Sequence, residues 1–245
     1  MSGVKELVVG VIGGLGPEAT LDFYAKVLKH SHARKDQDHI HLIIESNPKT
    51  PNRNEAIAGR GPSPAPALAD MARALERAGA DFAVMACNTA HAYEADIRNA
   101  LTIPFVSLIY EVVDEVRMSN PTTKRVGVLT TQGSLDANIF APAFSKHGID
   151  VLQLGDASQN RFMKILYSIK SGDRSTEIHD AMQQLGEELI ALGADVLIAG
   201  CTEVPLVLQN GDNTKMMIDS TDVLARRCVA YARGIKQLPV LLETP

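Results

Sequence analysis

The fold is determined by a stretch that occurs twice in altered form, as Gly79-Ala80-Asp81-Phe82-Ala83-Val84-Met85-Ala86-Cys87 and as Gly193-Ala194-Asp195-Val196-Leu197-Ile198-Ala199-Gly200-Cys201. Each copy begins with a glycine of the kind that ends helices, continues with an apolar run of strand length, and finishes at a cysteine. A short run that is apolar throughout predicts a strand buried on both faces, as in a parallel sheet. We therefore expect both cysteines at the carboxyl ends of buried strands.

Outward from these two stretches, short apolar runs alternate with longer amphipathic segments along the chain. Helical periodicity is clear in Ala67–Ala78 and Thr176–Leu192. Strands that alternate with helices predict an α/β fold with mainly parallel sheets covered on both faces. The runs that we expect to be strands are Leu7–Ile12, His41–Glu45, Phe82–Ala86, Pro104–Ser107, Arg125–Leu129, Val151–Leu154, Val196–Ala199 and Met216–Ile218.

The order of these segments repeats, which predicts two pseudo-symmetric domains. Val11 lies 76 residues before Cys87, and Val128 lies 73 residues before Cys201. Matching runs in the same order with similar gaps indicate one unit used twice. We expect two three-layer αβα domains with the active site in the cleft between them. The first comprises residues 1–110, joined by a returning C-terminal helix at 219–245, and the second comprises residues 111–218.

Composition limits the function classes. The chain has 245 residues and a formal net charge of −5, which does not favour a general nucleic-acid or membrane surface. Its three cysteines are too few for a disulfide framework, so we expect a reducing, cytoplasmic location. The apolar run Leu7–Gly16 is too short to span a bilayer. The turn Gly13-Gly14-Leu15-Gly16 lacks the spacing of a dinucleotide-binding fingerprint, and we expect no cofactor.

The chemistry is expected at Cys87 and Cys201. Ligands of open parallel sheets bind beyond the carboxyl ends of the strands, so two facing domains would place these thiols on opposite sides of one ligand. That geometry suits stereochemical inversion, in which one thiolate removes a proton and the other thiol delivers one. A helix beginning after each cysteine would lower the thiol pKa. The third cysteine, Cys228, lies within an amphipathic helix and is expected to be a buried apolar side chain.

Three segments resemble the aspartate/glutamate racemase family, whose members act without pyridoxal phosphate. They are Gly13–Thr20, Ala86–His91 and Ala199–Glu203. The resemblance implies a two-domain α/β fold, usually dimeric, with Cys87 and Cys201 as the catalytic pair. Glu203 stands where glutamate racemases of the cell-wall type carry a histidine, which favours the aspartate-type branch.

The resemblance also implies which residues bind the substrate. Arg53 matches the family's arginine for the side-chain carboxylate, although Asn52 stands where an Asp is common. Lys170 matches a second basic residue, with Lys164 as a weaker rival. An Arg suits a bidentate carboxylate contact and a Lys supplies a point charge. The remaining substrate-binding candidates are Gly14, in a turn where the backbone approaches closely, and Thr131, after the strand equivalent to the first one.

The residues that follow the two cysteines are candidates for binding and for tuning the thiols. Asn88, Thr89 and Thr202 can cap a turn, and their backbone amides can hold a carboxylate. His91 lies four residues after Cys87, and Glu203 lies two residues after Cys201. We expect these two side chains to tune a thiol, to orient the substrate ammonium, or only to cap and pack.

The resulting hypothesis is interconversion of L- and D-aspartate, with glutamate as a further substrate, by a homodimer. Several alternatives stay open. Arg53 and Lys170 also suit maleate isomerisation, and hydantoin racemases and malonate decarboxylases share the superfamily. A non-catalytic sensor of acidic amino acids would not need both thiols. A zinc site from Cys87, His91 and Cys201 lacks an evident fourth ligand, so no metal is expected.

Overall fold

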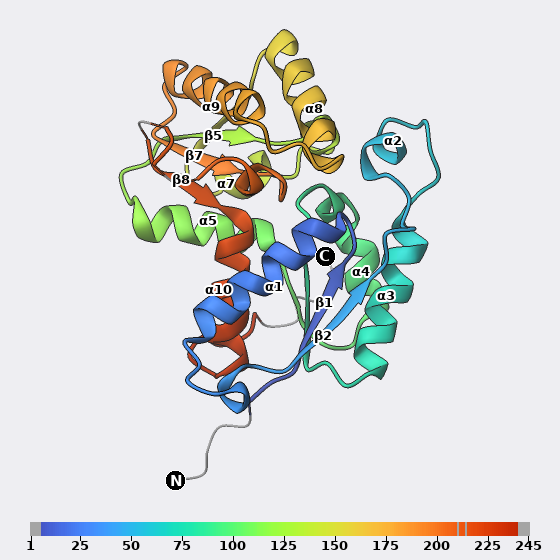
Figure 1. The fold of residues 1–245 in the computed structure, drawn as a ribbon. Helices are drawn as coiled ribbons and strands as arrows, with labels where there is room; N and C mark the ends of the chain where they lie inside the picture. Colours follow the sequence, from blue (N-terminus) through green and yellow to red (C-terminus); the bar gives the residue numbers. More distant parts are fainter. Residues whose placement is uncertain (1–5, 210, 214, 240–245) are drawn as a thin grey trace.

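The computed structural model describes residues 6–209, 211–213 and 215–239, and these form two four-stranded sheets whose strands are all parallel (Figure 1). The first sheet has the order β2-β1-β3-β4 and the second has the order β6-β5-β7-β8. The α/β prediction is confirmed, and every predicted strand is present with ends shifted by up to two residues. The strands are β1 (Val9–Gly13), β2 (Leu42–Ser46), β3 (Phe82–Met85), β4 (Phe105–Val106), β5 (Arg125–Leu129), β6 (Asp150–Leu152), β7 (Val196–Ala199) and β8 (Met217–Asp219).

The first sheet is covered on both faces because alternate side chains of a strand point to opposite sides. On one face, Val9 and Val11 join a core with Phe23 and with residues of the helices α5 and α10. On the other, Ile12 packs with Leu68 and its neighbours on α3. The helices of this half are α1 (Pro17–Ser31), α2 (Arg53–Ile57), α3 (Ala65–Arg77), α4 (Glu94–Ala100), α5 (Leu108–Ser119) and α10 (Ser220–Ala232), with 3-10 turns η1 (Asp36–Asp38) and η2 (Thr89–Tyr93).

The second sheet is layered in the same way. Leu197 and Ala199 pack against Phe162 and other apolar residues of α8 and α9. Val128 and Ile198 face the opposite way, into the same core that α5 and α10 share with the first sheet. The elements of this half are α6 (Gln132–Asp136), α7 (Ala141–Ser145), α8 (Asp156–Lys170), α9 (Thr176–Ala191) and the 3-10 turn η3 (Val204–Leu206).

The repeated Gly-Ala-Asp segments have the same structural role in both halves. Gly79 and Gly193 end helices with φ of 98° and 99°, a left-handed conformation that favours glycine. Asp81 Oδ2 then accepts from Val8 N at 2.7 Å, and Asp195 Oδ2 accepts from Arg125 N at 2.9 Å. Each aspartate thereby ties the start of the cysteine-bearing strand to the start of its neighbour, which explains why this tripeptide recurs.

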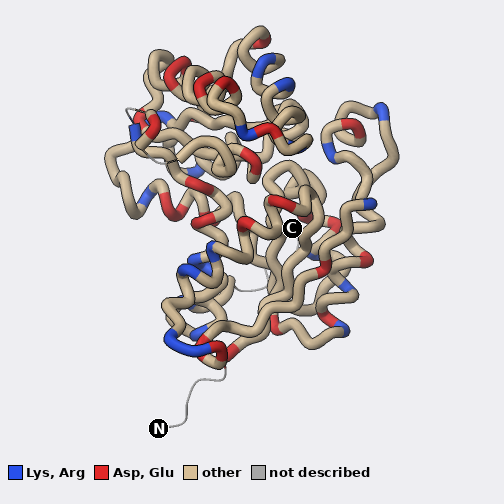
Figure 2. Tube along the Cα trace, in the orientation of Figure 1, with Lys and Arg blue, Asp and Glu red and all other residues tan. Residues whose placement is uncertain are grey.

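The C-terminal helix returns to the first half, where α10 lies beside α1 (Figure 1). Asp219 caps α10 by accepting from Thr221 N and Asp222 N. The helix is shorter than the predicted 219–245, since it ends at Ala232, and residues 240–245 of that prediction lie outside the described residues. Within the described part of the chain, none of the helices has the length and apolar character to cross a bilayer. Lys and Arg are interspersed with Asp and Glu over both halves (Figure 2).

Candidate active site

Cys87 follows β3 and Cys201 follows β7, the equivalent central strands of the two sheets. Their exposed fractions are only 6% and 5%. Both side chains line one cavity of about 20 Å³ between the halves. The other residues of its wall are Leu15, Arg53, Asn54, Asn88, Thr89, Thr131, Lys170, Thr202 and Glu203. Of the predicted site residues, the structure therefore brings together all except Gly14 and His91.

The pKa of Cys201 departs from the expected direction. Burial raises the pKa of this thiol to about 12, and the positive charge of Lys170 opposes the rise. The negative charge that Cys87 can carry is a further cause of the increase, so the two sulfur groups are close enough to interact. The predicted lowering was wrong because burial of the thiol outweighs the nearby positive charges, and only η3, a 3-10 turn of three residues, follows Cys201. A single short turn supplies little of the dipole of a long helix.

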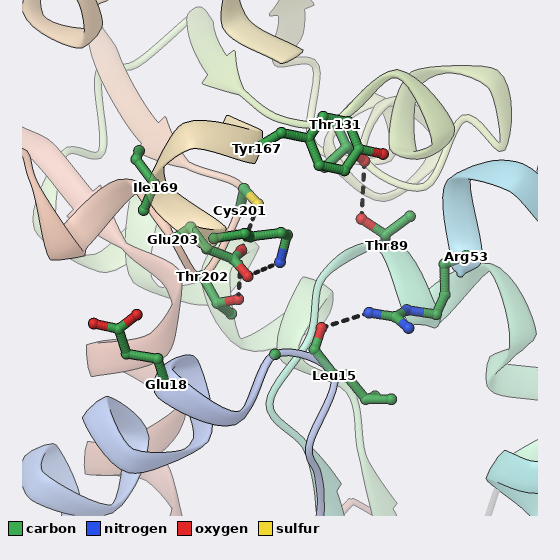
Figure 3. Close-up of polar contacts among 12 residues, drawn as sticks. Leu15, Glu18, Arg53, Thr89, Thr131, Tyr167, Ile169, Cys201, Thr202 and Glu203 are labelled. Atoms are coloured by element: carbon green, nitrogen blue, oxygen red, sulfur yellow. Dashed lines mark hydrogen bonds and ion pairs between the residues drawn. The ribbon is translucent and has the colours of Figure 1, made fainter. Parts of the chain in front are cut away.

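Glu203 is the centre of a polar cluster around Cys201 (Figure 3). Its side chain is 5% exposed and accepts from the Cys201 thiol at 3.0 Å and from the Thr202 hydroxyl at 3.1 Å. Lys170 Nζ, from the last residue of α8, donates to the other carboxylate oxygen. Gly16, which precedes α1, completes the enclosure, because a Cβ there would lie 2.9 Å from Glu203 Oε1. The second thiol is thus held by an ionised pair and not by a helix terminus.

Arg53 lies at the opposite end of the cavity, at the start of α2 (Figure 3). Asn52 caps this short helix by accepting from the amides of Asn54 and Glu55. The Arg53 guanidinium donates to the carbonyls of Leu15 and Pro51, and its buried Nε finds no partner among the described residues. The Nε–H donor of this fixed cation is therefore left for a ligand.

Hydroxyl groups close the cavity on the side between Cys87 and the second sheet. Thr89 Oγ1 and Thr131 Oγ1 lie 2.9 Å apart (Figure 3). Ser134 Oγ donates to Thr89 Oγ1 at 3.1 Å. Thr131 also caps α6 by accepting from Ser134 N. These hydroxyls can redirect their protons toward an anion, since a hydroxyl both donates and accepts.

Asn54 was missed by the sequence analysis. Its Oδ1 accepts from Gly133 N at 2.9 Å, which joins α2 of the first half to α6 of the second across the site. Glu18 and Arg174 make a second link, an ion pair of 2.6 Å. Nothing in the local sequence marks Asn54 except its place beside Arg53.

The Asn88 side chain does not cap the turn that follows Cys87, although a capping role was predicted. Its Nδ2 donates to Ser220 Oγ at 3.0 Å, and Ser220 Oγ donates to the carbonyl of Ala199 at 2.7 Å. Both side chains are buried, with exposed fractions of 1% and 0%. Ser220, at the start of α10, was also missed by the sequence analysis.

His91 and Gly14 support the site from behind. His91 Nε2 accepts from Leu108 N at 3.1 Å, so the ring proton is on Nδ1, which donates to the Cys87 carbonyl at 2.8 Å. Both ring nitrogens of His91 therefore have hydrogen-bond partners in the backbone, and neither forms a hydrogen bond with the Cys87 thiol. Gly14 N donates to Thr20 Oγ1, and a Cβ at Gly14 would lie 2.3 Å from Asn47 N. This glycine permits a close backbone approach, as predicted, but to the loop after β2.

The remaining candidates lie elsewhere. Lys164 borders a surface cavity with Tyr167 and Ser168. Cys228 is fully buried in the shared core, where burial raises its pKa. No cluster of His, Cys, Asp and Glu among residues 6–209, 211–213 and 215–239 has an arrangement that could hold a metal ion.

The chain is similar to known proteins over most of its length. The model of the Asp/Glu/Hydantoin racemase family matches residues 12–228. The chain is 30% identical over 227 residues to the broad specificity amino-acid racemase RacX of Bacillus subtilis (strain 168), covering 91% of this chain and 97% of that protein. Picrophilus torridus aspartate racemase matches with a TM-score of 0.79 and 28% identity over 95% of this chain and 96% of its own. An aspartate racemase homologue from Pyrococcus horikoshii OT3 matches with a TM-score of 0.74 and 26% identity over 94% and 99%. These matches show that the chain belongs to the Asp/Glu/hydantoin racemase family.

Proposed function

We propose that this protein interconverts L- and D-aspartate, with Cys87 and Cys201 as the two acid/base groups. The observation that carries the proposal is the shared cavity, in which two buried thiols from equivalent strands meet two basic side chains. One thiolate removes the Cα proton from one face of the substrate. The other thiol protonates the opposite face, and the reverse reaction exchanges their roles.

The difficult step is the removal of a weakly acidic Cα proton. The negative charge that develops on the α-carboxylate needs donors already in place, since placed dipoles stabilise charge more than water does. The hydroxyls of Thr89 and Thr131 are suited to this task because they already lie 2.9 Å apart beside the cavity. Lys170 and Arg53 supply positive charge from the two ends.

Glu203 has a specific part in this proposal. A thiol with a pKa of about 12 is protonated at neutral pH and cannot serve as a base without an acceptor. The Glu203 carboxylate already accepts from that thiol at 3.0 Å, so it can take the proton from Sγ to Oε2. Cys201 then becomes the thiolate while no proton leaves the cavity. In the reverse direction, the same carboxylate returns the proton to Sγ after Cys201 has acted as the acid.

The charges of the cavity wall favour an acidic amino acid. Arg53 and Lys170 are positive and Glu203 is negative, so with both thiols protonated the wall carries one net positive charge. Aspartate carries one net negative charge at neutral pH. The similarity to a relative named as a broad specificity racemase supports a second candidate, a wider set of amino acids.

Entry of the substrate requires opening. A cavity of about 20 Å³ holds about one water molecule and cannot contain an amino acid. The contacts that cross it, Asn54 with Gly133 and Glu18 with Arg174, would have to break and form again in each cycle. Closure excludes water from the reacting groups, which strengthens every charge interaction inside.

The experiment is a chiral assay of a panel of L-amino acids and of maleate, with no cofactor added. We expect D-aspartate from L-aspartate at the highest rate, and no D-aspartate with Cys87→Ala or Cys201→Ala. Full activity in either variant would refute the two-thiol mechanism. Isomerisation of maleate without racemisation would refute the proposed reaction, and faster turnover of other amino acids would favour the wider specificity.

A further inference from the structure

The orientation of the Asn88 side-chain amide is fixed by its neighbour. Ser220 Oγ has one proton, which it donates to the Ala199 carbonyl at 2.7 Å. Its remaining contact, to Asn88 at 3.0 Å, must therefore be one in which it accepts. Only the NH₂ end of the amide can donate, so Asn88 Nδ2 faces Ser220. The oxygen and nitrogen of this amide cannot be exchanged without placing two acceptors together.

The amide oxygen of Asn88 is then the atom left for a ligand. It is buried and has no hydrogen-bond partner among the described residues, and the side chain lines the cavity between the thiols. Buried polar atoms nearly always have a partner, so an unsatisfied one beside a cavity indicates a group that binds there. An isolated acceptor suits a cationic donor such as an ammonium group.

The wall of the same cavity also carries an unsatisfied buried donor. Arg53 Nε is buried without a partner, and its charge suits a carboxylate. An acceptor beside the thiols and a cationic donor at the far end together match a molecule with an ammonium group near its reacting carbon and a carboxylate further away. A dicarboxylate without an ammonium group, such as succinate, can accept from Arg53 Nε but offers no donor to Asn88 Oδ1.

We propose that Ser220 is a positioning residue that holds Asn88 Oδ1 toward the substrate ammonium, and that this contact selects amino acids over dicarboxylates that lack nitrogen. The proposal rests on the proposed function, whose substrate it describes more closely. Ser220 also ties the two half-sites together. It bonds Asn88, beside Cys87, and Ala199, two residues before Cys201. Without its hydroxyl, the Asn88 amide is free to turn and present its NH₂ group.

The test compares the binding of D-aspartate with that of succinate, which has the same two carboxylates and no ammonium group. Calorimetry on the wild-type protein should give tighter binding of D-aspartate. Ser220→Ala should lower the ratio of the two affinities about tenfold, the size of effect expected for a hydrogen bond to a charged group. Asn88→Asp keeps an acceptor and should retain the preference for D-aspartate.

Ser31→Ala is the matched control, because Ser31 is a buried serine that also donates to a backbone carbonyl, in α1 away from the cavity. It should leave the affinity ratio unchanged. Equal weakening of both ligands by Ser220→Ala would overturn the proposal, as would a wild-type protein with no preference for D-aspartate. These outcomes concern binding only. Failure of the racemase proposal would appear separately, as absence of D-aspartate formation by the wild type.

Discussion

At the scale of single residues, the Glu203 carboxylate connects the Cys201 thiol to the ammonium group of Lys170. Replacing it by Gln removes the acceptor for the Cys201 proton while keeping the size of the side chain. We expect kcat/KM to fall roughly 100-fold, the lower range for loss of an acid–base group. The fall must be equal for L- and D-aspartate because their equilibrium constant is one.

The diagnostic readout for Glu203→Gln is the isotope effect with substrate deuterated at Cα. Proton transfer at Cys201 should become more rate-limiting. The isotope effect on kcat/KM should therefore rise for the enantiomer that Cys201 deprotonates and fall for the other. Asp70→Asn is the control, since it removes a carboxylate on α3 that is 75% exposed and paired with Arg73. Parallel changes for both enantiomers would show that Glu203 has only a structural role.

His91 should make stability depend on pH. Burial lowers its pKa below the usual value of about 6.5. Between the folded-state and unfolded-state pKa values, His91 therefore binds a proton in the unfolded chain but not in the folded chain. Above pH ~6.5, titration of His91 does not reduce the free energy of unfolding. Below that value, it lowers the free energy of unfolding by up to ~1.4 kcal/mol per pH unit, until the folded-state pKa is reached. Urea unfolding of His91→Gln should show a flatter decline than the wild type, and an unchanged slope would contradict this assignment.

Some site residues can be predicted from a local sequence pattern, whereas others depend on contacts between distant parts of the chain. Cys87 and Cys201 stand out because they end equivalent apolar runs. Asn54 and Ser220 act through contacts with residues 79 and 132 positions away. Such contacts depend on how the two halves meet, which no local pattern encodes. The direction of the Cys201 pKa depended on burial in the same way.

At the scale of elements, α2 and α6 form the contact that closes the cavity. A Cβ at Gly133 would lie 2.6 Å from Asn54 Oδ1 and 3.2 Å from Asn54 Cα. Gly133→Ala should therefore push α2 away from α6. We expect KM for aspartate to rise roughly tenfold, in line with the cost of overpacking, with a smaller change in kcat.

Gly155→Ala provides the comparison for Gly133→Ala. Gly155 has a φ of −67°, and a Cβ there meets nothing within 4 Å. Steady-state kinetics of this variant should match those of the wild type. If Gly133→Ala behaves in the same way, closure does not depend on the contact between α2 and α6.

Elements were predictable where burial and local sequence agree. The strands are short apolar runs between turn residues, and each was found. The segment after Cys201 carries polar residues that favour a helix start, yet it forms only η3. Val204 and Leu208 are fully buried in the core of the second half, so packing and not local sequence decides its conformation.

At the scale of the whole molecule, α1 presents an apolar stripe to solvent. Leu21, Tyr24 and Leu28 have exposed fractions of 66%, 39% and 37%. Tyr24 and Leu28 lie beside the edge strand β2, since they line a cavity of about 680 Å³ together with Leu42 and Ile44 of that strand. We expect a second copy of the chain to cover this face, as the predicted homodimer requires.

Leu21→Glu should then convert the dimer to a monomer in light scattering after size-exclusion chromatography. Leu192→Glu changes another exposed leucine, 55% exposed at the end of α9, and should leave the dimer intact. A monomeric wild type, or a dimer that survives Leu21→Glu, would contradict this placement of the interface.

The internal repeat was the strongest whole-molecule prediction from sequence, because both sheets have matching strand orders and matching cysteine positions. The division near residue 110 stays a prediction. It falls within α5, whose side chains belong to a core shared by both sheets. A shared core contains no local signal for where one unit ends.

The most direct measurement is the isotope content of both enantiomers after brief incubation of L-aspartate in D₂O. Two thiols on opposite faces require the D-aspartate formed early to carry deuterium at Cα, delivered by the second thiol, while the remaining L-aspartate keeps its hydrogen. D-aspartate that retains the original hydrogen would show that one group moves the proton between the faces, and the two-thiol account would be wrong.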